Sequence, residues 1–174
     1  MDDCNLMYAE YYSNTILKYT NQTVTIMFNV KYECSDPVSP ELISEFEKKR
    51  GITLPSNYVF ILTNCNEFFL ADDQFGAILD DEGEEITGLE EPMLSLEDFE
   101  RANFDLSDQM KEYYNFSNED FYIIAGLHFN CYLLIGCNAE NWDKIFRANP
   151  QEGEIVELCD NFVDFVNEVL EMVD

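Results

Sequence analysis

Two helices and the tight corner between them are predicted by residues 41–62, which read ELISEFEKKRGITLPSNYVFIL. Ser39 suits the N-cap of the first helix, and Pro40 suits its first position. Three basic residues favour the negative C-terminal end of this helix, and Gly51 then provides a left-handed stop. Pro55 begins the second helix, whose apolar residues recur at helical spacing.

Two polar residues mark further helix ends. Asn66 follows the second helix and is predicted to be its left-handed cap. Ser95, with Asp98 three residues later, resembles a capping box and predicts a short helix that runs through Phe99.

Strand patterns lie on both sides of these helices. Apolar and polar residues alternate over residues 23–32, which indicates a strand with one buried face. Apolar runs at 121–125 and 132–135 flank the sequence GLHFN and predict a hairpin.

The last element is predicted from an apolar stripe. Phe162, Phe165 and Val169 recur at helical spacing, so a helix over about residues 160–173 is expected to bury them against a sheet, with Asp160 as its N-cap. The order of elements is strand, helices, strands, helix. This order predicts the α+β class, a single domain with a central, mainly antiparallel sheet and helices packed around it.

The charge is strongly one-sided, with 36 acidic against nine basic residues and a formal net charge of −27. Such a field repels nucleic acid and anionic membranes, so neither is expected as a direct partner. It attracts basic proteins and speeds the encounter with them. Solubility alone, or adaptation to a salty cytoplasm, explains the same composition, and the sequence leaves these interpretations open.

The acidity is concentrated in the middle of the chain. Residues 67–91 carry ten acids and no lysine or arginine. A stretch of this charge density repels itself, and a cationic partner would relieve the repulsion; a solvated loop is the competing interpretation. The residues predicted to contact a partner are acids of this stretch and two apolar anchors beside them, namely Asp72, Asp73, Phe75, Ile78, Asp80, Asp81 and Glu82.

Patterns typical of catalysis or metal binding are missing from the sequence. It has one histidine, His128, and six cysteines that form no C-x-x-C pair, whereas structural zinc sites use closely spaced cysteine or histidine pairs. His128 lies between two apolar runs and is expected in a turn or packing role. An EF-hand frame around Gly83 would place Ile78 and Leu89 at ligand positions, where neither side chain coordinates calcium. We therefore expect no enzyme activity, catalytic residue, cofactor or metal.

The first residues of the chain are acidic, whereas a secretory signal has a basic start followed by an apolar stretch. No apolar run approaches the roughly 20 residues that a membrane-spanning helix needs. A cytoplasmic protein with reduced thiols and no structural disulfide is therefore expected.

The helix pair and the elements after it resemble the SUKH superfamily, including its yeast cell-wall-regulator branch. The residues that match the family's G-I-x-L-P-x-x-Y corner and second helix are Gly51, Ile52, Leu54, Pro55, Tyr58, Leu62 and Asn66. Residues 94–98 resemble the middle segment of the family, 121–135 its central hairpin and 162–166 its closing helix. Glu67 and Phe68 stand where the family usually has two glycines.

The resemblance covers about residues 38–174 and implies one SUKH-like α+β domain, preceded by an N-terminal extension, residues 1–37. It also implies a non-enzymatic binding protein. Bacterial members are immunity proteins, so the expected partner is a cognate, basic, nucleic-acid-targeting toxin domain whose active site is occluded. The alternatives are a regulatory scaffold of the cell-wall-regulator type and an acidic nucleic-acid mimic.

Overall fold

The computed structural model describes residues 32–70, 75–79, 83, 85–89, 92–105 and 119–173. The predicted strand at 23–32 lies outside these residues, except for Tyr32. The helices and helical turns are α2 (Pro40–Arg50), α3 (Ser56–Asn64), α4 (Leu96–Glu100), η1 (Arg101–Asp105), η2 (His128–Asn130), α6 (Phe162–Asp164) and η3 (Phe165–Val169). The strands are β1 (Tyr32–Cys34), β2 (Phe68–Leu70), β3 (Phe75–Leu79), β4 (Glu85–Leu89), β5 (Phe121–Leu127), β6 (Cys131–Gly136), β7 (Ile145–Asn149), β8 (Glu154–Cys159) and β9 (Leu170–Val173).

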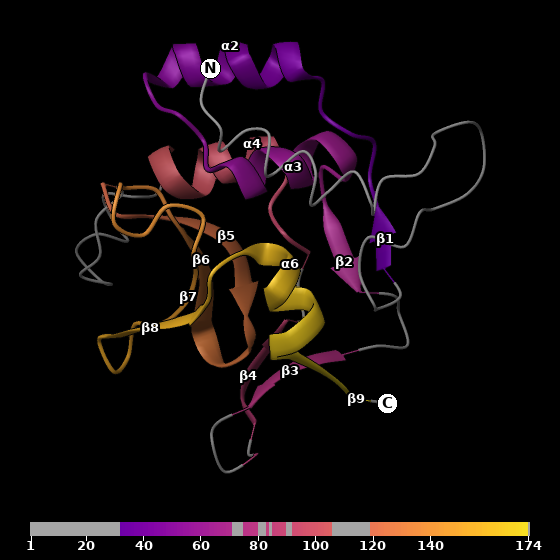
Figure 1. The fold of residues 1–174 in the computed structure, drawn as a ribbon, viewed down its shortest axis with the longest axis vertical. Helices are drawn as coiled ribbons and strands as arrows, with labels where there is room; N and C mark the ends of the chain where they lie inside the picture. Colours follow the sequence, from indigo (N-terminus) through magenta and orange to yellow (C-terminus); the bar gives the residue numbers. More distant parts are fainter. Residues whose placement is uncertain are drawn as a thin grey trace.

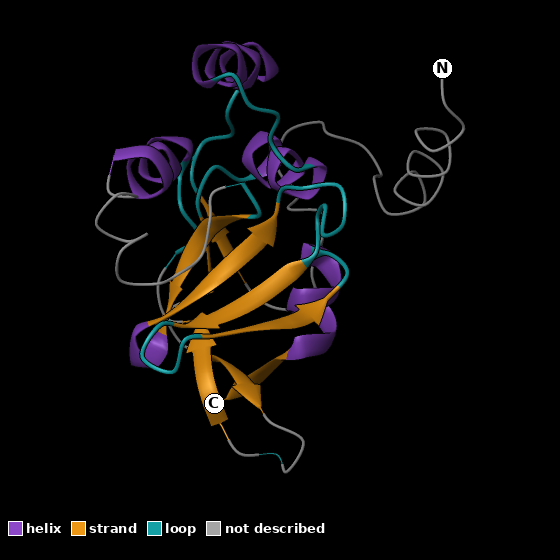
Figure 2. Cartoon of the chain, turned by 90° about the vertical axis from the view of Figure 1, so that its left-hand side faces the viewer, coloured by secondary structure: helices purple, strands orange, loops and turns teal. Residues whose placement is uncertain are grey.

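The described strands form three sheets, and every pair in them is antiparallel. The largest sheet has the order β5-β6-β7-β8, the second has the order β4-β3-β9, and the third joins β1 to β2. The predicted hairpin is confirmed as β5 and β6. Figures 1 and 2 show α2, α3 and α4 gathered at one end of the strands and α6 against the side of the largest sheet. The fold is therefore α+β, as predicted.

The corner between α2 and α3 is built as the sequence predicts. The backbone N–H of Leu42 donates to Ser39 Oγ over 3.3 Å, and Gly51 is left-handed, with φ 68° and ψ 31°. The carboxylate of Glu47 accepts a hydrogen bond from the Leu54 N–H over 2.8 Å, which holds the corner closed. These partners lie three and seven residues apart, so the corner is determined locally.

Asn66 has a different role from the predicted one. Helix α3 ends two residues before it, and Cys65 follows in an extended conformation, so Asn66 is not a left-handed cap. Its Oδ1 instead accepts a hydrogen bond from the Leu96 N–H over 3.1 Å. Ser95 is the N-cap of α4, as predicted, and its Oγ accepts from the Asp98 N–H over 3.1 Å. Asn66 therefore ties the end of α3 to the start of α4.

Aromatic side chains join these helices to the largest sheet. Phe99 of α4 is fully buried, and its ring centroid lies 5.3 Å from that of Tyr122 on β5. The ring of Tyr58 on α3 lies 4.8 Å from Phe99, and its hydroxyl donates to the Leu94 carbonyl oxygen over 2.9 Å. Aromatic pairs add about 0.5–1.5 kcal/mol beyond their buried area. Burial raises the pKa of Tyr58 well above its usual value, so its hydroxyl remains a donor.

The closing helix is shorter than predicted. It begins at Phe162 with Asn161, rather than Asp160, as the N-cap, and its last turn ends at Val169. The Asn161 side chain can accept a hydrogen bond from the first turn because its own backbone is extended. The predicted burial is confirmed for Phe162 and Phe165, which are 1% and 0% exposed.

The residues after this helix form β9, which pairs with β3. Gly76 on β3 permits the close approach, because a Cβ atom there would lie 3.1 Å from a methyl group of Leu170 and 3.0 Å from one of Leu70. The end of the predicted helix is therefore a strand, and its partner is far away in the sequence.

A disulfide joins Cys34 and Cys65, whose Cα atoms lie 5.0 Å apart. The prediction of no structural disulfide is therefore wrong. Strand β1 pairs with β2, which follows α3, so Cys34 lies beside the end of α3 although 31 residues separate the two cysteines. Cys131, Cys137 and Cys159 form no disulfide.

Candidate partner-binding site

The β5–β6 hairpin closes in a tight turn over residues 128–131. The Cys131 N–H donates to the His128 carbonyl oxygen, and the two residues between them, Phe129 and Asn130, have φ angles of 58° and 57°. Positive φ at both central positions is typical of a type I′ turn. Asparagine suits this conformation, whereas phenylalanine adopts it at a cost of about 1–2 kcal/mol. A bulky residue held in this way points to a functional constraint.

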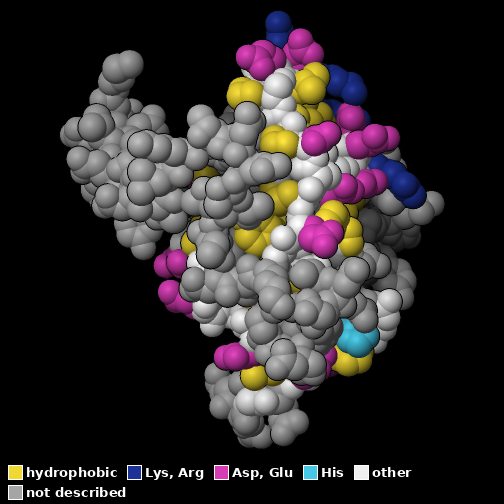
Figure 3. Space-filling model, turned by 90° about the vertical axis from the view of Figure 1, so that its right-hand side faces the viewer, with side chains coloured by type: hydrophobic (Ala, Val, Ile, Leu, Met, Phe, Trp, Pro, Cys, Tyr) yellow, Lys and Arg dark blue, Asp and Glu magenta, His cyan; other side chains and the backbone are white. Residues whose placement is uncertain are grey.

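Phe129 is the most exposed of the large apolar side chains that the structure describes, at 57%. Its ring stacks on the imidazole of His128, with 4.4 Å between the centroids and 19° between the planes. His128 lies in a turn, as predicted, and Figure 3 shows the histidine at the surface with a hydrophobic side chain beside it. The two rings therefore form a stacked aromatic pair at the surface, in which each ring covers one face of the other.

Strands β3 and β4 lie beside this turn, at the end of the molecule away from α2 (Figure 1). The buried Thr87 hydroxyl on β4 donates to the His128 carbonyl oxygen over 2.7 Å, which fixes the turn. Oε1 of Glu85 lies 3.8 Å from Nδ1 of His128. Glu85 pairs across the β3–β4 hairpin with Leu79, whose side chain is 36% exposed. An aromatic surface, a carboxylate and an apolar side chain therefore lie on neighbouring hairpins.

A hollow of about 470 Å³ runs along the turn and is lined by residues 126–132. It is open to solvent, unlike the enclosed apolar clefts that hold most small-molecule ligands. An open hollow of this volume has room for a side chain.

Only two of the seven predicted contact residues, Phe75 and Ile78, lie within the described part of the chain. Five of them lie outside the described residues, namely Asp72, Asp73, Asp80, Asp81 and Glu82. Phe75 begins β3, opposite Val173 of β9. Ile78 is 1% exposed and belongs to the core, so its predicted role as a surface anchor is wrong. Leu79, the last residue of β3, is exposed instead.

Phe129, Glu85 and Leu79 were not among the predicted contacts. The sequence did contain a sign that Phe129 is unusual. Two-residue hairpin turns favour Asn-Gly and related pairs, whereas the two residues at the centre of this turn are Phe-Asn. A large aromatic residue is rare at a position with positive φ, which glycine and asparagine favour, so this turn is unusual.

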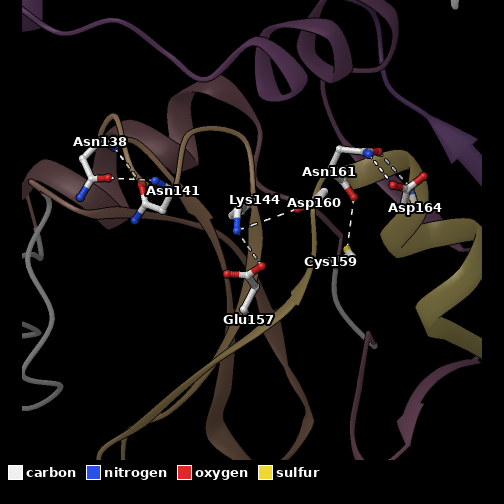
Figure 4. Close-up of polar contacts among 8 residues, drawn as sticks. All are labelled: Asn138, Asn141, Lys144, Glu157, Cys159, Asp160, Asn161 and Asp164. Atoms are coloured by element: carbon white, nitrogen blue, oxygen red, sulfur yellow. Dashed lines mark hydrogen bonds and ion pairs between the residues drawn. The ribbon is translucent and has the colours of Figure 1, made fainter.

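A second polar cluster lies at the opposite end of the largest sheet, around the turn between β6 and β7 (Figure 4). Asn138 and Asn141 each accept the backbone N–H of the other over 3.0 Å, and Asn141 Nδ2 donates to the Asp120 carbonyl oxygen over 2.8 Å. Lys144 Nζ lies 2.8 Å from Glu157 Oε1 on β8. These contacts join neighbouring turns and strands, so the cluster supports the fold.

Asp143, in the same turn, holds the start of α3. Its carboxylate accepts a hydrogen bond from the Asn57 N–H over 2.8 Å, and the residue is 5% exposed. Helix α3 has no side-chain cap of its own because Pro55 occupies the N-cap. Burial raises the pKa of Asp143 above its usual value, and the hydrogen bonds from Asn57 and Ser56 act in the opposite direction. This carboxylate is engaged in structure.

The free thiols with shifted pKa values are not activated for catalysis. Burial raises the pKa of Cys137 to about 11 and that of Cys159 to about 12, so both stay protonated at neutral pH. A nucleophilic cysteine needs a thiolate. Within the described residues, no group of three or more His, Cys, Asp or Glu side chains is placed to hold a metal ion. No helix in the described part of the chain has the length and apolar character that crossing a membrane requires.

The corner, hairpin and closing helix define a small α+β domain of the SUKH type. The SMI1 / KNR4 family (SUKH-1) matches residues 37–168, and the chain belongs to this family. Membership supports a role of the immunity or cell-wall-regulator type. A search of curated proteins finds no match to the chain.

Proposed function

We propose that the chain is a cytoplasmic immunity protein that binds a basic, nucleic-acid-targeting toxin domain and neutralises it by covering its active site. The observation that carries this proposal is SUKH-1 membership in a chain with a net charge of −27. An enzyme that acts on nucleic acid needs a positively charged groove for the phosphate backbone. A strongly acidic protein complements such a groove and competes with the substrate for it.

The proposed mechanism requires no chemistry on this chain. The shifted thiols are protonated, and the buried carboxylate of Asp143 caps a helix. We therefore propose no catalytic residue, cofactor or metal. Occlusion alone removes the activity of the toxin, because a covered groove cannot admit its substrate.

The proposed contact surface is the acid-rich stretch around the β3–β4 hairpin. Its members are Asp72, Asp73, Phe75, Asp80, Asp81 and Glu82. In the described part of the same hairpin, Glu85 and Leu79 are exposed and continue the pattern of charge beside an apolar group. Long-range attraction should raise the association rate and weaken as salt exceeds ~0.15 M, where the screening length is about 8 Å.

A regulatory scaffold is the second candidate, because the resemblance includes the cell-wall-regulator branch of the family. A scaffold would bind its partners without abolishing their activity. An acidic nucleic-acid mimic would instead bind many basic grooves and would show no preference for one toxin.

Growth rescue with the basic toxin domain encoded beside this chain tests the proposal. Wild-type protein should restore growth to cells that express the toxin. A variant with five amides at the proposed surface should rescue poorly, namely Asp72→Asn, Asp73→Asn, Asp80→Asn, Asp81→Asn and Glu82→Gln. A control of equal net charge should rescue fully, with its amides at exposed positions elsewhere, namely Asp36→Asn, Glu41→Gln, Glu45→Gln, Glu97→Gln and Glu140→Gln.

The outcomes separate the function from the surface. Failure of the wild-type protein to rescue growth would contradict the immunity function. Equal rescue by the two amide variants would show that the acid-rich stretch is not the contact surface.

A further inference from the structure

The turn over residues 128–131 is rigidly held, yet it displays an aromatic ring to solvent. The Thr87 hydroxyl fixes the His128 carbonyl oxygen over 2.7 Å, and the backbone bond from Cys131 closes the turn on the same oxygen. Phe129 nevertheless exposes 57% of its surface in a left-handed conformation that its side chain disfavours. The exposed part of this ring is therefore available for contact with another molecule.

Negative charge borders the aromatic surface. Oε1 of Glu85 lies 3.8 Å from Nδ1 of His128, and the Glu85 side chain is 39% exposed. An exposed aromatic ring with a carboxylate nearby is an environment that a guanidinium group prefers, because the guanidinium stacks on aromatic rings and is attracted to carboxylates.

We propose that the stacked rings of His128 and Phe129, together with the Glu85 carboxylate, bind an arginine side chain of a basic partner. The guanidinium group stacks on the face of the Phe129 ring that is turned away from His128, beside the hollow lined by residues 126–132, and the nearby Glu85 carboxylate attracts its charge. The proposal rests on the proposed function in taking the toxin domain as the partner. It adds the type of residue that is recognised and the side chains that recognise it.

Charge favours this occupant over a second copy of the chain and over nucleic acid. A second copy carries its own net charge of −27, so the two copies repel each other. Nucleic acid bases also stack on aromatic rings, but their phosphates are repelled by the acidic protein. Lysine offers a charge without the planar group, so arginine should be preferred.

Peptide titration into the full chain tests the proposal. Two short peptides that differ only in carrying three arginines or three lysines are compared by NMR and calorimetry. The arginine peptide should shift the imidazole signals of His128, which is the only histidine, and should bind roughly 5-fold tighter than the lysine peptide. This preference is the signature of stacking, since the two peptides have the same charge.

Variants locate the site. Phe129→Asn removes the ring but suits the left-handed turn, so it should weaken arginine-peptide binding about 5- to 10-fold without lowering the melting temperature. Glu85→Gln should weaken binding as well. Leu42→Ala is the matched control, because Leu42 is 55% exposed on α2, and it should leave the affinity unchanged.

Equal affinity for the two peptides would overturn the proposal, as would unchanged binding by Phe129→Asn or tighter binding of single-stranded RNA than of the arginine peptide.

Toxin binding separates the two levels of inference. If Phe129→Asn binds the toxin like wild type, the arginine site is refuted and the proposed function stands. If the wild-type chain does not bind the toxin but binds the arginine peptide more tightly than the lysine peptide, the arginine site is supported and the proposed function is refuted.

Discussion

Replacing Phe165 by alanine tests how the closing helix is held. The side chain is 0% exposed, and its ring lies 5.8 Å from that of Phe162. Phe162 in turn lies 5.8 Å from Phe68 of β2, with the two rings at 88°. Phe165 is therefore part of a chain of rings that connects the last helix to a strand near the start of the domain.

The expected loss follows from this burial. Truncating a buried phenylalanine to alanine costs about 3–5 kcal/mol, through lost transfer free energy and the cavity left behind. A domain of ordinary stability has a free energy of unfolding of about 5–15 kcal/mol, so the variant should lose roughly a fifth of it or more. With a urea slope of about 1–3 kcal/mol per molar, the unfolding midpoint should fall by at least ~1 M.

Equilibrium urea denaturation followed by circular dichroism measures this loss. Leu42→Ala is the control, because an exposed substitution should change the free energy of unfolding by no more than about 0.5 kcal/mol. A loss of less than about 1 kcal/mol in Phe165→Ala would refute the packing described for the closing helix.

Three further measurements test other parts of the structure. Without reductant, the denatured chain should be about 2 Da lighter than the reduced chain because of the Cys34–Cys65 disulfide, and equal masses would contradict this disulfide. Cys34→Ser should lower the free energy of unfolding by roughly 3–4 kcal/mol, because the disulfide closes a loop between residues 31 positions apart. Gly136→Ala should cost about 3 kcal/mol or more, because the new Cβ would lie 1.9 Å from the Asn141 carbonyl oxygen, and a wild-type melting temperature would contradict this contact. Burial raises the pKa of Asp143 above 3.8, so ionising this carboxyl group costs stability. The stability of the wild type should therefore fall relative to that of Asp143→Asn as the pH rises through the acid range above 3.8. A stability difference that does not change with pH would contradict the burial of Asp143.

Local signals were enough to predict the α2–α3 corner and the β5–β6 hairpin. Ser39 and Gly51 act on residues within a few positions of themselves, so their roles can be inferred without knowing the rest of the fold. The burial of Phe162 and Phe165 was predictable for the same reason, since helical spacing alone places them on one face.

Contacts between distant residues explain the errors. Leu170 continues the apolar stripe of the closing helix, but it pairs with Ile78 of β3, where Gly76 leaves room for the Leu170 side chain. The proximity of Cys34 and Cys65 likewise depends on the pairing of β1 with β2. The spacing of residues in the sequence does not reveal that Leu170 lies beside Ile78 or that Cys34 lies beside Cys65.

The candidate site was predictable in its charge but not in its geometry. The ten acids of residues 67–91 are visible in the sequence, whereas the burial of Ile78 and the exposure of Leu79 depend on how the neighbouring strands pair with β3. The exposure of Phe129 depends on the type of turn that closes the hairpin. Composition therefore led to the expectation of a basic partner, whereas only the fold shows the His128 and Phe129 rings beside one of these acids, Glu85.

Titration of the toxin domain with the full chain is the decisive test of neutralisation. We predict that toxin activity falls to zero at one chain per toxin domain. The association rate should fall at least roughly 10-fold as salt rises from about 0.05 M to about 0.5 M, because attraction between opposite charges drives the encounter. A toxin that keeps its activity in the presence of a several-fold excess of the chain would contradict the immunity function.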